Sequence, residues 1–403
     1  MTSDSRAAAV ALPAPVSAPA DRSKPDMRLL GLLALGHMVI DINQGSLAAI
    51  LPFLKSSLAL SFTATGAIVL VANTTSSLIQ PLFGYFADKT SRRWLLPLSV
   101  ALSAIGIGLI GLAPSYAAVL ALVVITGFGV AAYHPEGYRT ATAVAGDKKA
   151  TGVSIFSTGG NIGIAVGPLL VTALIARFGL PGSLGMLIPG LLVAALLTAV
   201  LPMLSAPSAL RAQAALDQRP TMAGAMGLLV LVIALRSWTQ VGFTTYVPFY
   251  WIEVLHGDPT MVGTLLGVFL GAGVLGTLAA GPIADRVGMR RFMVSTLLLI
   301  VPIAVSFLFV SRPYAVLILG ILGFVLVSTF TVSVVLGQAY MPRNPGMASG
   351  MIVGFAIGAG GLGATALGGI ADRWGLATAL WILAVMPLGA FVAALFLPEP
   401  RAR

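Results

Sequence analysis

Twelve apolar segments, each about 20 residues long, dominate this sequence and restrict it to a membrane fold. A helix rises about 1.5 Å per residue, so a helix of about 20 residues crosses the hydrocarbon core of a bilayer. The segments cover residues 28–54, 64–86, 95–113, 116–138, 151–176, 183–203, 224–250, 260–283, 292–310, 314–340, 347–371 and 376–397. Turn-forming residues separate them, as at 113–115 and 343–346. We therefore expect an all-α membrane protein with twelve transmembrane helices.

The composition excludes several other classes of protein. Charged residues make up 9% of the 403-residue chain, against about 25% in a soluble domain, so lipid must supply part of the solvent. The chain has no Cys and only three His, so we expect no disulfide, no metal ion and no other cofactor. The formal charge of +10 lies mostly in short breaks between apolar segments, with no basic run interleaved with aromatic residues. We therefore expect no nucleic-acid partner.

The positive charges are distributed unevenly between the two sets of breaks. The odd-numbered breaks hold four of the 23 Lys and Arg residues, whereas the even-numbered breaks and both tails hold 18. Arg236, inside a segment, is the remaining one. Because Lys and Arg are retained on the cytoplasmic side, we expect a multi-pass protein of a bacterial inner membrane with both termini in the cytoplasm. No continuous apolar core precedes a cleavage site near the start, so we expect no signal peptide.

The sequence also repeats itself at a displacement of 196 or 197 positions. The matching stretches are Asp88 to Arg93 with Asp285 to Arg290, Leu51-Pro52-Phe53 with Val247-Pro248-Phe249, and Gln44 with Gln240. Two copies of one six-helix unit explain this pattern, and parallel six-helix repeats are a transporter architecture. The expected organisation is a disordered cytoplasmic tail at 1–27, six-helix bundles at 28–203 and 224–397, a cytoplasmic linker at 204–223 and a cytoplasmic tail at 398–403.

The loop after the second segment of each repeat carries a family signature. Residues 84–93 read Gly-Tyr-Phe-Ala-Asp-Lys-Thr-Ser-Arg-Arg, and residues 281–291 are their copy. Both resemble the signature loop of the major facilitator superfamily, which implies the major facilitator fold with two pseudo-symmetric halves. The resemblance also implies a cytoplasmic latch between the halves, formed by Asp88, Arg92, Arg93, Asp285 and Arg290. The alternative is that these charges only set the topology, although acidic residues contribute little to it.

Two further motifs narrow the resemblance. The fifth segment reads Gly-Gly-Asn-Ile-Gly-Ile-Ala-Val-Gly-Pro at 159–168. Through Gly163, Gly167 and Pro168 it resembles the motif of proton-linked antiporters, although Leu169 follows where that motif has Gly. Gly163 and Gly167 also form a small-xxx-small face, so close helix packing explains them equally well. The strings at 37–45 and 133–137 are similar to those of the fosmidomycin-resistance branch, which exports small phosphonate antibiotics and some other toxic compounds.

Ionisable residues inside the predicted spans are the strongest candidates for function. Asp41 and Glu136 are such residues, and a charge near the bilayer centre costs at least about 2.5–3.5 kcal/mol. His37 precedes Asp41 by four positions, so the two lie on one helical face and can share a proton. Glu136 lies close to His134 and three residues before Arg139. We predict proton coupling at His37, Asp41, His134 and Glu136; permanent His–Asp and Glu–Arg pairs that brace the helices are the alternative.

A polar cavity between the halves is the expected substrate site. Arg236 is the only positive charge deep in the second half, one residue from the repeat counterpart of Asp41. It needs an anion, either a first-half carboxylate or the substrate, and a guanidinium matches phosphonate oxygens bidentately. The predicted substrate-binding residues are Asn43, Gln44, Tyr133, Arg139, Arg236, Trp238, Gln240 and Gln338. For the aromatic residues, a place in the interfacial girdle is the alternative.

These observations predict a secondary transporter and not an enzyme. We expect a monomer in the lipid bilayer that exports a small toxic compound, such as a fosmidomycin-like phosphonate, by proton-coupled alternating access. A proton-linked importer of a small organic anion or sugar is the alternative, because the antiporter motif is incomplete. A membrane enzyme or receptor is a third class. The sequence shows no paired metal ligands, no nucleophile with a base and no phosphate loop with Lys, so we assign no catalytic residue.

Overall fold

The computed structural model describes residues 25–80, 82–83, 92–146, 149–204, 221–342 and 345–399. Most of the expected N-terminal tail and linker lies outside the described residues, as do Asp88 and the last four residues. The described residues form helices, turns and bends without a strand. The all-α prediction is therefore confirmed.

The first half contains six membrane-crossing units. They are α1 (Met27–Ser57), α2 (Phe62–Asn73) with the π-helix η1 (Thr74–Leu78), α4 (Leu95–Leu109) with η2 (Ile110–Leu112), α5 (Tyr116–Val144), α6 (Lys149–Phe178), and α7 (Leu187–Val200) between η3 (Leu180–Met186) and η4 (Leu201–Met203). Side-chain caps fix several starts: Asp26 accepts from the backbone N–H groups of Arg28 and Leu29, and Ser115 accepts from that of Ala118.

The second half repeats this pattern. Its units are α8 (Ala223–Phe249) with the π-helix η6 (Tyr250–Val254), η7 (Pro259–Met261) with α9 (Val262–Val287), α10 (Met289–Phe307), α11 (Arg312–Tyr340), α12 (Pro345–Trp374), and α13 (Leu376–Val385) followed by α14 (Pro387–Leu395). The turns before α10 and α13 use Gly288 and Gly375, whose φ angles of 93° and 85° suit glycine. Each predicted segment thus corresponds to one unit, and the twelve-helix prediction is confirmed.

Equivalent hydrogen bonds anchor the start of each half. The N–H of Asp26 donates to the carbonyl oxygen of Val144 at the end of α5 over 3.0 Å, and that of Met222 donates to Tyr340 at the end of α11 over 2.8 Å. Donor and acceptor are both displaced by 196 positions, the displacement found in the sequence. The repeat therefore extends from residue pattern to backbone contact.

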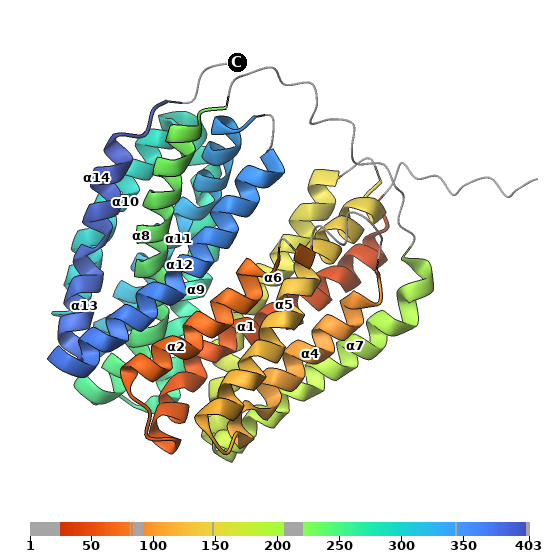
Figure 1. The fold of residues 1–403 in the computed structure, drawn as a ribbon, viewed down its shortest axis with the longest axis horizontal. Coiled ribbons are helices and arrows are strands. Elements are labelled where there is room, and N and C mark those ends of the chain that lie inside the picture. Colours follow the sequence, from red (N-terminus) through yellow and green to blue (C-terminus); the bar gives the residue numbers. More distant parts are fainter. Residues whose placement is uncertain are drawn as a thin grey trace, which may run out of the picture.

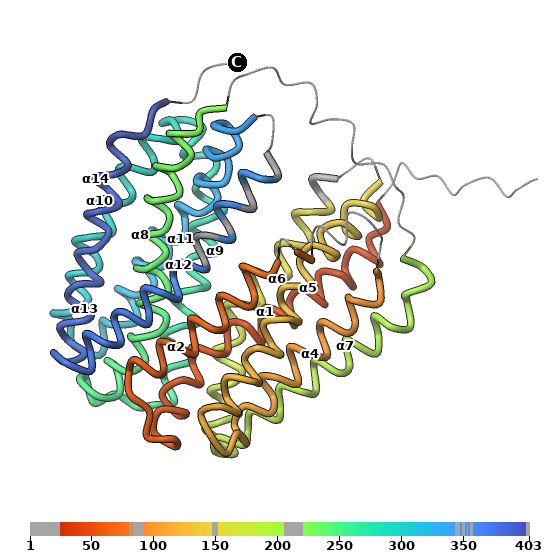
Figure 2. Tube along the Cα trace, viewed as in Figure 1, coloured from red at the N-terminus to blue at the C-terminus, as the bar shows by residue number. Residues whose placement is uncertain are grey.

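The two halves are separate bundles that lie side by side (Figure 1). We call the end of the molecule at which α14 ends the terminal face. The opposite end is the distal face, which holds the ends of α1 and α12 and the start of α2. The bundles diverge toward the terminal face and come together at the distal face, as the Cα trace also shows (Figure 2). The two halves thus contact each other mainly toward the distal face.

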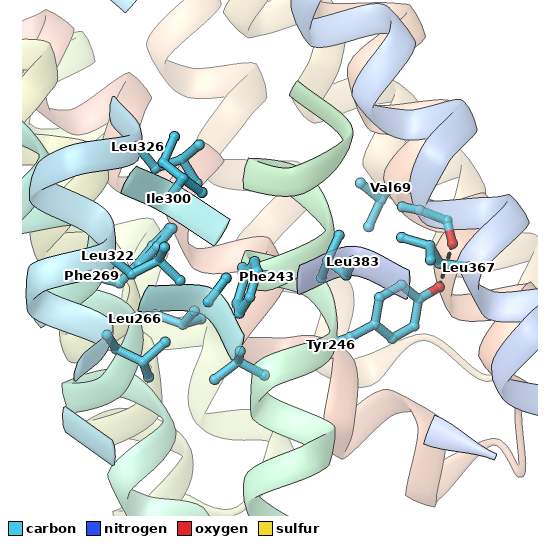
Figure 3. Packing of buried hydrophobic residues seen from close by; sticks show 14 of the residues in the cluster. Val69, Phe243, Tyr246, Leu266, Phe269, Ile300, Leu322, Leu326, Leu367 and Leu383 are labelled. Carbon is cyan, nitrogen blue, oxygen red and sulfur yellow. Dashed lines mark hydrogen bonds between the residues drawn. The ribbon is translucent and has the colours of Figure 1, made fainter. Parts of the chain in front are cut away.

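Polar and aromatic contacts join the halves at the distal face. Lys55 Nζ of α1 lies 3.1 Å from Glu253 Oε1 of η6, and the carboxylate of Asp372 in α12 accepts hydrogen bonds from the start of α2. Deeper in the seam, Val69 of α2 and Tyr246 of α8 belong to one buried apolar cluster, and the Tyr246 hydroxyl donates to the carbonyl oxygen of Ala364 in α12 (Figure 3). The seam therefore combines apolar packing with hydrogen bonds.

The outer surface suits lipid. Nine helices in the described part are long and apolar enough to cross a membrane, and α1, α2 with η1, and α12 supply the remaining crossings. Large apolar side chains point outward, among them Leu192, Leu278 and Phe396, which are 66%, 68% and 73% exposed. In a soluble protein such exposure would promote aggregation, whereas in a bilayer it is the required surface.

Glycine residues let α6 pack directly on the backbone of α1. A Cβ atom built at Gly159, Gly163 or Gly167 would lie within 3.0 Å of the carbonyl oxygen of Ala34, Met38 or Ile42, respectively. Real Cβ atoms essentially never make such a contact. The hydroxyl of Ser46 joins the same seam by donating to the carbonyl oxygen of Gly167 over 2.9 Å. Close packing therefore accounts for the spacing of Gly163 and Gly167.

We predict that Gly163→Ala lowers the melting temperature of the purified protein, because the added methyl group forces α1 and α6 apart at a cost of about 1–3 kcal/mol. Gly31→Ala is the matched control. Gly31 lies in α1, the helix that α6 packs against, but nothing lies within 4 Å of a Cβ built there. That substitution should be neutral or stabilising, since Ala favours helix more than Gly. Equal melting temperatures for the two variants would contradict the packing argument.

Candidate functional site

The centre of the first half holds a buried cluster of His37, Asp41 and His134, which we name the His–Asp cluster. His37 and Asp41 lie on one face of α1, and His134 reaches them from α5. The Nε2 atom of His37 is 3.3 Å from Asp41 Oδ2, and that of His134 is 3.5 Å from Asp41 Oδ1. His37 and Asp41 are 3% and 7% exposed. The predicted His37–Asp41 pair thus exists and gains a third member from another helix.

Backbone carbonyl groups fix the tautomer of both imidazoles. His37 Nδ1 lies 2.8 Å from the carbonyl oxygen of Phe156 in α6, and His134 Nδ1 lies 2.8 Å from that of Val130. A carbonyl oxygen can only accept a hydrogen bond, so each Nδ1 must carry the proton. In a neutral imidazole the Nε2 atom is then a bare acceptor, and it faces an oxygen of Asp41.

Each contact between Nε2 and the carboxylate therefore needs an added proton to become a hydrogen bond. With no added proton the cluster has a net charge of −1, with one it is neutral, and with two it is +1. Burial disfavours both charged states, so the neutral cluster with one shared proton suits this environment. The geometry is compatible with the predicted proton coupling at His37, Asp41 and His134, which remains a prediction.

Neighbouring residues hold the His–Asp cluster in place. The ring of Phe156 stacks on His37 with centroids 4.2 Å apart, and Tyr133 donates to the carbonyl oxygen of Leu33 over 2.8 Å. A Cβ built at Gly160 would lie 2.5 Å from His37 Nε2 and 2.6 Å from Asp41 Oδ2. Tyr133, predicted to bind substrate, therefore links α5 to α1 here, and Gly160 leaves room for the carboxylate.

The same three side chains present one ligand atom each within 4.8 Å of one another. Two imidazoles and a carboxylate could hold a divalent metal ion. The separations of 3.3 and 3.5 Å between nitrogen and oxygen are somewhat longer than the roughly 2.7–3.2 Å of an N–H···O hydrogen bond, so either a proton or a divalent cation between Nε2 and the carboxylate fits the geometry. A chelator control therefore belongs in every titration of this site.

Glu136 and Arg139 form a second pair on α5. Glu136 is fully buried, and its Oε1 atom lies 3.9 Å from Arg139 Nη2. The hydroxyl of Thr140 donates to the carbonyl oxygen of Glu136 over 2.8 Å. The predicted ion pair is present, and it lies nearer the terminal face than Asp41 does. Its role in proton coupling remains a prediction.

A polar cavity lies one helical turn from the His–Asp cluster, toward the distal face. Gln44 of α1, Asn73 and Ser76 at the π-helical turn of α2, and Thr126 of α5 give it hydrogen-bonding groups. Asn73 Nδ2 is buried without a partner in the described part of the chain, as is Asn43 Oδ1, although Asn43 Nδ2 donates to Ser103 over 3.1 Å. Gln44 was one of the predicted substrate-binding residues, and it lines this cavity. The cavity lies within the first half rather than between the halves.

Arg236 is buried against α11. Its Nε atom donates to the hydroxyl of Thr329 over 2.9 Å, and its Nη2 atom donates to the carbonyl oxygen of Leu326 over 2.9 Å. Among the described residues, these guanidinium N–H groups donate hydrogen bonds to α11 and not to a carboxylate of the first half. A small hollow beside Thr329, Ser333 and Leu297 adjoins the guanidinium. The expected anionic partner remains a proposal.

The other predicted substrate residues are spread over the second half. Trp238 packs on the backbone of α12, where a Cβ at Gly363 would meet its indole ring at 2.5 Å. Gln240 and Gln338 are half-buried in α8 and α11. None of the three lines the cavity around Asn73. The described conformation therefore does not gather the predicted substrate residues into one site.

Comparison with known proteins identifies the family. Residues 33–361 match the model of the Major Facilitator Superfamily. The chain belongs to the major facilitator superfamily. It is therefore a multi-pass membrane transporter with a small-molecule substrate.

This major facilitator protein has relatives along almost its whole length. It is 31% identical to the fosmidomycin resistance protein of Escherichia coli K12 over 386 residues, which cover 94% of this chain and 95% of that protein. It is also 31% identical to an uncharacterized MFS-type transporter, YfnC, of Bacillus subtilis 168 over 384 residues, which cover 93% of this chain and 94% of the relative. The resemblance to the fosmidomycin-resistance branch is thus confirmed as a similarity of sequence.

Solved structures share the fold at low identity. A bacterial homologue of the human lysosomal transporter Spinster, described as inward-facing and occupied, superposes with a TM-score of 0.78 at 15% identity, covering 92% of this chain and 96% of that chain. A mutant of the nucleoside transporter NupG superposes with a TM-score of 0.75 at 16% identity, covering 92% of this chain and 99% of that chain. These matches establish the major facilitator fold.

The predicted latch of this major facilitator protein is only partly described. Asp88 lies outside the described residues, whereas Asp285 is exposed at the end of α9. Arg93 donates to the carbonyl oxygen of Leu204, and Arg290 donates to that of Leu395 over 2.6 Å, so each binds the end of its own half. Arg92 is exposed. A latch between the halves therefore remains a proposal.

Selective labelling of histidine with ¹⁵N tests the tautomers. The chain has three His, and His256 is exposed outside the site. In a His256→Gln background we predict that both remaining imidazoles keep the Nδ1 proton across the pH range, and that the Nε2 resonances move far more than the Nδ1 resonances. The spectra should be unchanged by a chelator. An Nε2–H tautomer in either residue would contradict the assignment.

Proposed function

We propose that this major facilitator protein exports a small toxic compound, such as a fosmidomycin-like phosphonate, in exchange for protons. The observation that carries the proposal is the His–Asp cluster, in which carbonyl groups hold both Nδ1 atoms and leave two acceptors facing one carboxylate. Such a site gains or loses a proton rather than merely bracing the helices. The 31% identity to a fosmidomycin resistance protein supports the substrate class.

The orientation follows from the charge distribution. The described helix ends at the terminal face carry Arg92, Arg93, Arg139, Arg286, Arg290 and Arg291, and they adjoin the Lys- and Arg-rich breaks of the sequence. We therefore place the terminal face in the cytoplasm and the distal face outside a bacterial inner membrane. The described conformation, closed at the distal face, is then the one open to the cytoplasm. We take the functional unit to be a monomer, because one chain contains both halves of the fold.

The proton site can influence helix positions directly. His37 and Asp41 belong to α1, His134 belongs to α5, and the Phe156 carbonyl group belongs to α6. Adding a proton turns a contact between two acceptors into a hydrogen bond, so it strengthens the link between α1 and its neighbours. Gln44 follows Asp41 by one turn and lines the polar cavity. Protonation and ligand binding would therefore be linked through α1.

The importer alternative has one observation in its favour. Leu169 follows Pro168 where the antiporter motif has Gly, and its side chain packs against Gly267 of α9. Everted vesicles with an acidic lumen distinguish the two functions. An antiporter moves fosmidomycin into the lumen as protons leave, whereas a symporter moves the substrate and protons out together.

We predict that Asp41→Asn abolishes pH-driven fosmidomycin movement in these vesicles while leaving expression and folding intact. The amide keeps the shape of the side chain but does not titrate in this range. Asp258→Asn, at an exposed carboxylate outside the spans, is the matched control and should transport normally. Normal transport by Asp41→Asn with an unchanged pH profile would show that Asp41 is only a structural brace.

We further predict that Arg236 contributes to binding of an anionic substrate. Arg236→Lys keeps the charge but loses the planar fork. The affinity for fosmidomycin measured by calorimetry should fall by about tenfold or more, since a hydrogen bond to a charged group contributes about 1.5–3 kcal/mol. Arg236→Gln should weaken binding further. Arg177→Lys, at an exposed arginine, is the control. Unchanged affinity in both Arg236 variants would assign Arg236 a structural role.

A further inference from the structure

We propose that the His–Asp cluster also binds a divalent transition-metal ion, with Zn²⁺ as the expected occupant, and that the bound ion blocks proton exchange. The metal site stands on the geometry of His37, Asp41 and His134 alone. Only the blocking effect rests on the proposed function, because it requires that the cluster carries the exchanged proton.

The separations between nitrogen and oxygen match the edges of a tetrahedral metal site. His37 Nε2 lies 3.3 Å from Asp41 Oδ2, and His134 Nε2 lies 3.5 Å from Asp41 Oδ1. Ligands at the roughly 2.0–2.1 Å of zinc sites lie about 3.3–3.4 Å apart when the angle at the ion is tetrahedral. An N–H···O hydrogen bond is shorter, at roughly 2.7–3.2 Å. The nitrogen and oxygen atoms therefore have the spacing that an ion between them would set, with the carboxylate binding through one or both oxygens.

The carbonyl groups behind the two rings prepare both imidazoles as ligands. Nδ1 of His37 donates to the carbonyl oxygen of Phe156, and Nδ1 of His134 donates to that of Val130, each over 2.8 Å. The lone pair of each Nε2 then faces Asp41. A metal-binding histidine almost always donates its other N–H in this way, which fixes the orientation of the ring and raises its basicity. Both rings therefore have the outer hydrogen bond that is typical of metal sites.

Two packed helices supply the three ligands. His37 and Asp41 are four residues apart on one face of α1, the spacing at which paired ligands of helical zinc sites occur. His134 of α5 completes the set, and one ligand atom from each residue lies within 4.8 Å of the others. The ring of Phe156 stacks on His37 with centroids 4.2 Å apart, so that ligand is already oriented. The small number of His residues predicted no metal site, but the fold brings two of the three together beside a carboxylate.

The donor atoms determine the class of ion. Two imidazole nitrogens and a carboxylate oxygen suit Zn²⁺ and its first-row neighbours, whereas Mg²⁺ and Ca²⁺ prefer oxygen ligands. A structural zinc site has four protein ligands, while a site with three keeps the fourth position for water. We therefore expect Zn²⁺ to bind reversibly when it is supplied, rather than to be a permanent part of the fold.

The ion and the proton need the same atoms. Each Nε2 lone pair can bond either a proton or the ion, so a bound ion displaces any proton held between Nε2 and the carboxylate, and that proton leaves to solvent. The ion would also bond ligands of α1 and α5 at once, whereas a proton bridges a single contact between His and Asp. An occupied cluster can therefore neither take up a proton nor let these two helices separate.

Cobalt(II) is the probe for the site, because it replaces Zn²⁺ and absorbs visible light strongly at a tetrahedral site. The full-length protein, without a His tag and freed of metal, is titrated with CoCl₂ in detergent. We expect saturable visible absorption at one ion per chain, loss of the absorption when ZnCl₂ is added, and no effect of MgCl₂. His37→Gln and His134→Gln should each weaken Co²⁺ binding by about tenfold or more, since even the loss of an outer hydrogen bond costs that much. His256→Gln, at an exposed His outside the cluster, is the matched control and should bind as the parent does.

A second readout leaves the cluster unsubstituted, in case its variants fold poorly. In His256→Gln protein with ¹⁵N-labelled histidine, ZnCl₂ should shift the Nε2 resonances of His37 and His134 and leave both Nδ1 atoms protonated. In everted vesicles, ZnCl₂ should slow pH-driven fosmidomycin movement, and a chelator should restore it.

The absence of saturable Co²⁺ absorption would overturn the metal site. Binding that persists unchanged in both His37→Gln and His134→Gln, or that disappears in His256→Gln, would place the ion elsewhere and overturn it as well. Zn²⁺ that binds the cluster without slowing transport would refute the blocking effect. If no metal binds while Asp41→Asn still abolishes transport, the metal site is wrong and the proposed function stands. If Co²⁺ binds the cluster and Asp41→Asn transports normally, the metal site stands and the proposed function fails.

Discussion

Direct contact between the backbones of α1 and α6 underlies both the packing and the chemistry of the first half. Without side chains at Gly159, Gly163 and Gly167, α6 lies against the carbonyl oxygens of α1. That approach brings the Phe156 carbonyl group to His37 and leaves space beside Asp41 at Gly160. In lipid, where no water satisfies buried polar groups, such a carbonyl group is a scarce partner. The glycine motif thus has a chemical consequence, because it supplies the acceptor that sets the imidazole tautomer.

The seams between the halves have different physical characters. The contact between α6 and α9 depends on glycine and backbone, so it can slide without breaking strong bonds. The contact between α2 and α12 combines close packing with a carboxylate cap at its outer end, and the adjacent contact between α1 and η6 adds an ion pair. A seam that must open and close repeatedly needs contacts that are strong in one state and well solvated in the other. Polar groups at the water boundary satisfy this requirement, since water replaces their partners when the face opens.

Much of the fold could be predicted from the sequence because lipid imposes simple rules. Segment length, charge asymmetry and the repeat of 196 or 197 positions were sufficient for twelve helices and two halves. The pair of His37 and Asp41 followed from a spacing of four in one helix. The contact with His134 and the carbonyl group of Phe156 depends on how three helices cross, which no local pattern encodes. Asn73 and Ser76 did carry a signal, because the run of polar residues at 73–77 interrupts an apolar segment. No pattern in the sequence signalled the hydrogen bonds from Arg236 to α11.

The fixed tautomers also determine how protons leave the His–Asp cluster. An imidazole conducts a proton by gaining it at one nitrogen and releasing it from the other. Here the second nitrogen of each ring already donates to a backbone carbonyl group, which cannot pass a proton on. Neither ring can therefore pass a proton from one of its nitrogens to the other. If the cluster carries the exchanged proton as proposed, that proton must enter and leave on the side of the cluster where the two Nε2 atoms and Asp41 meet.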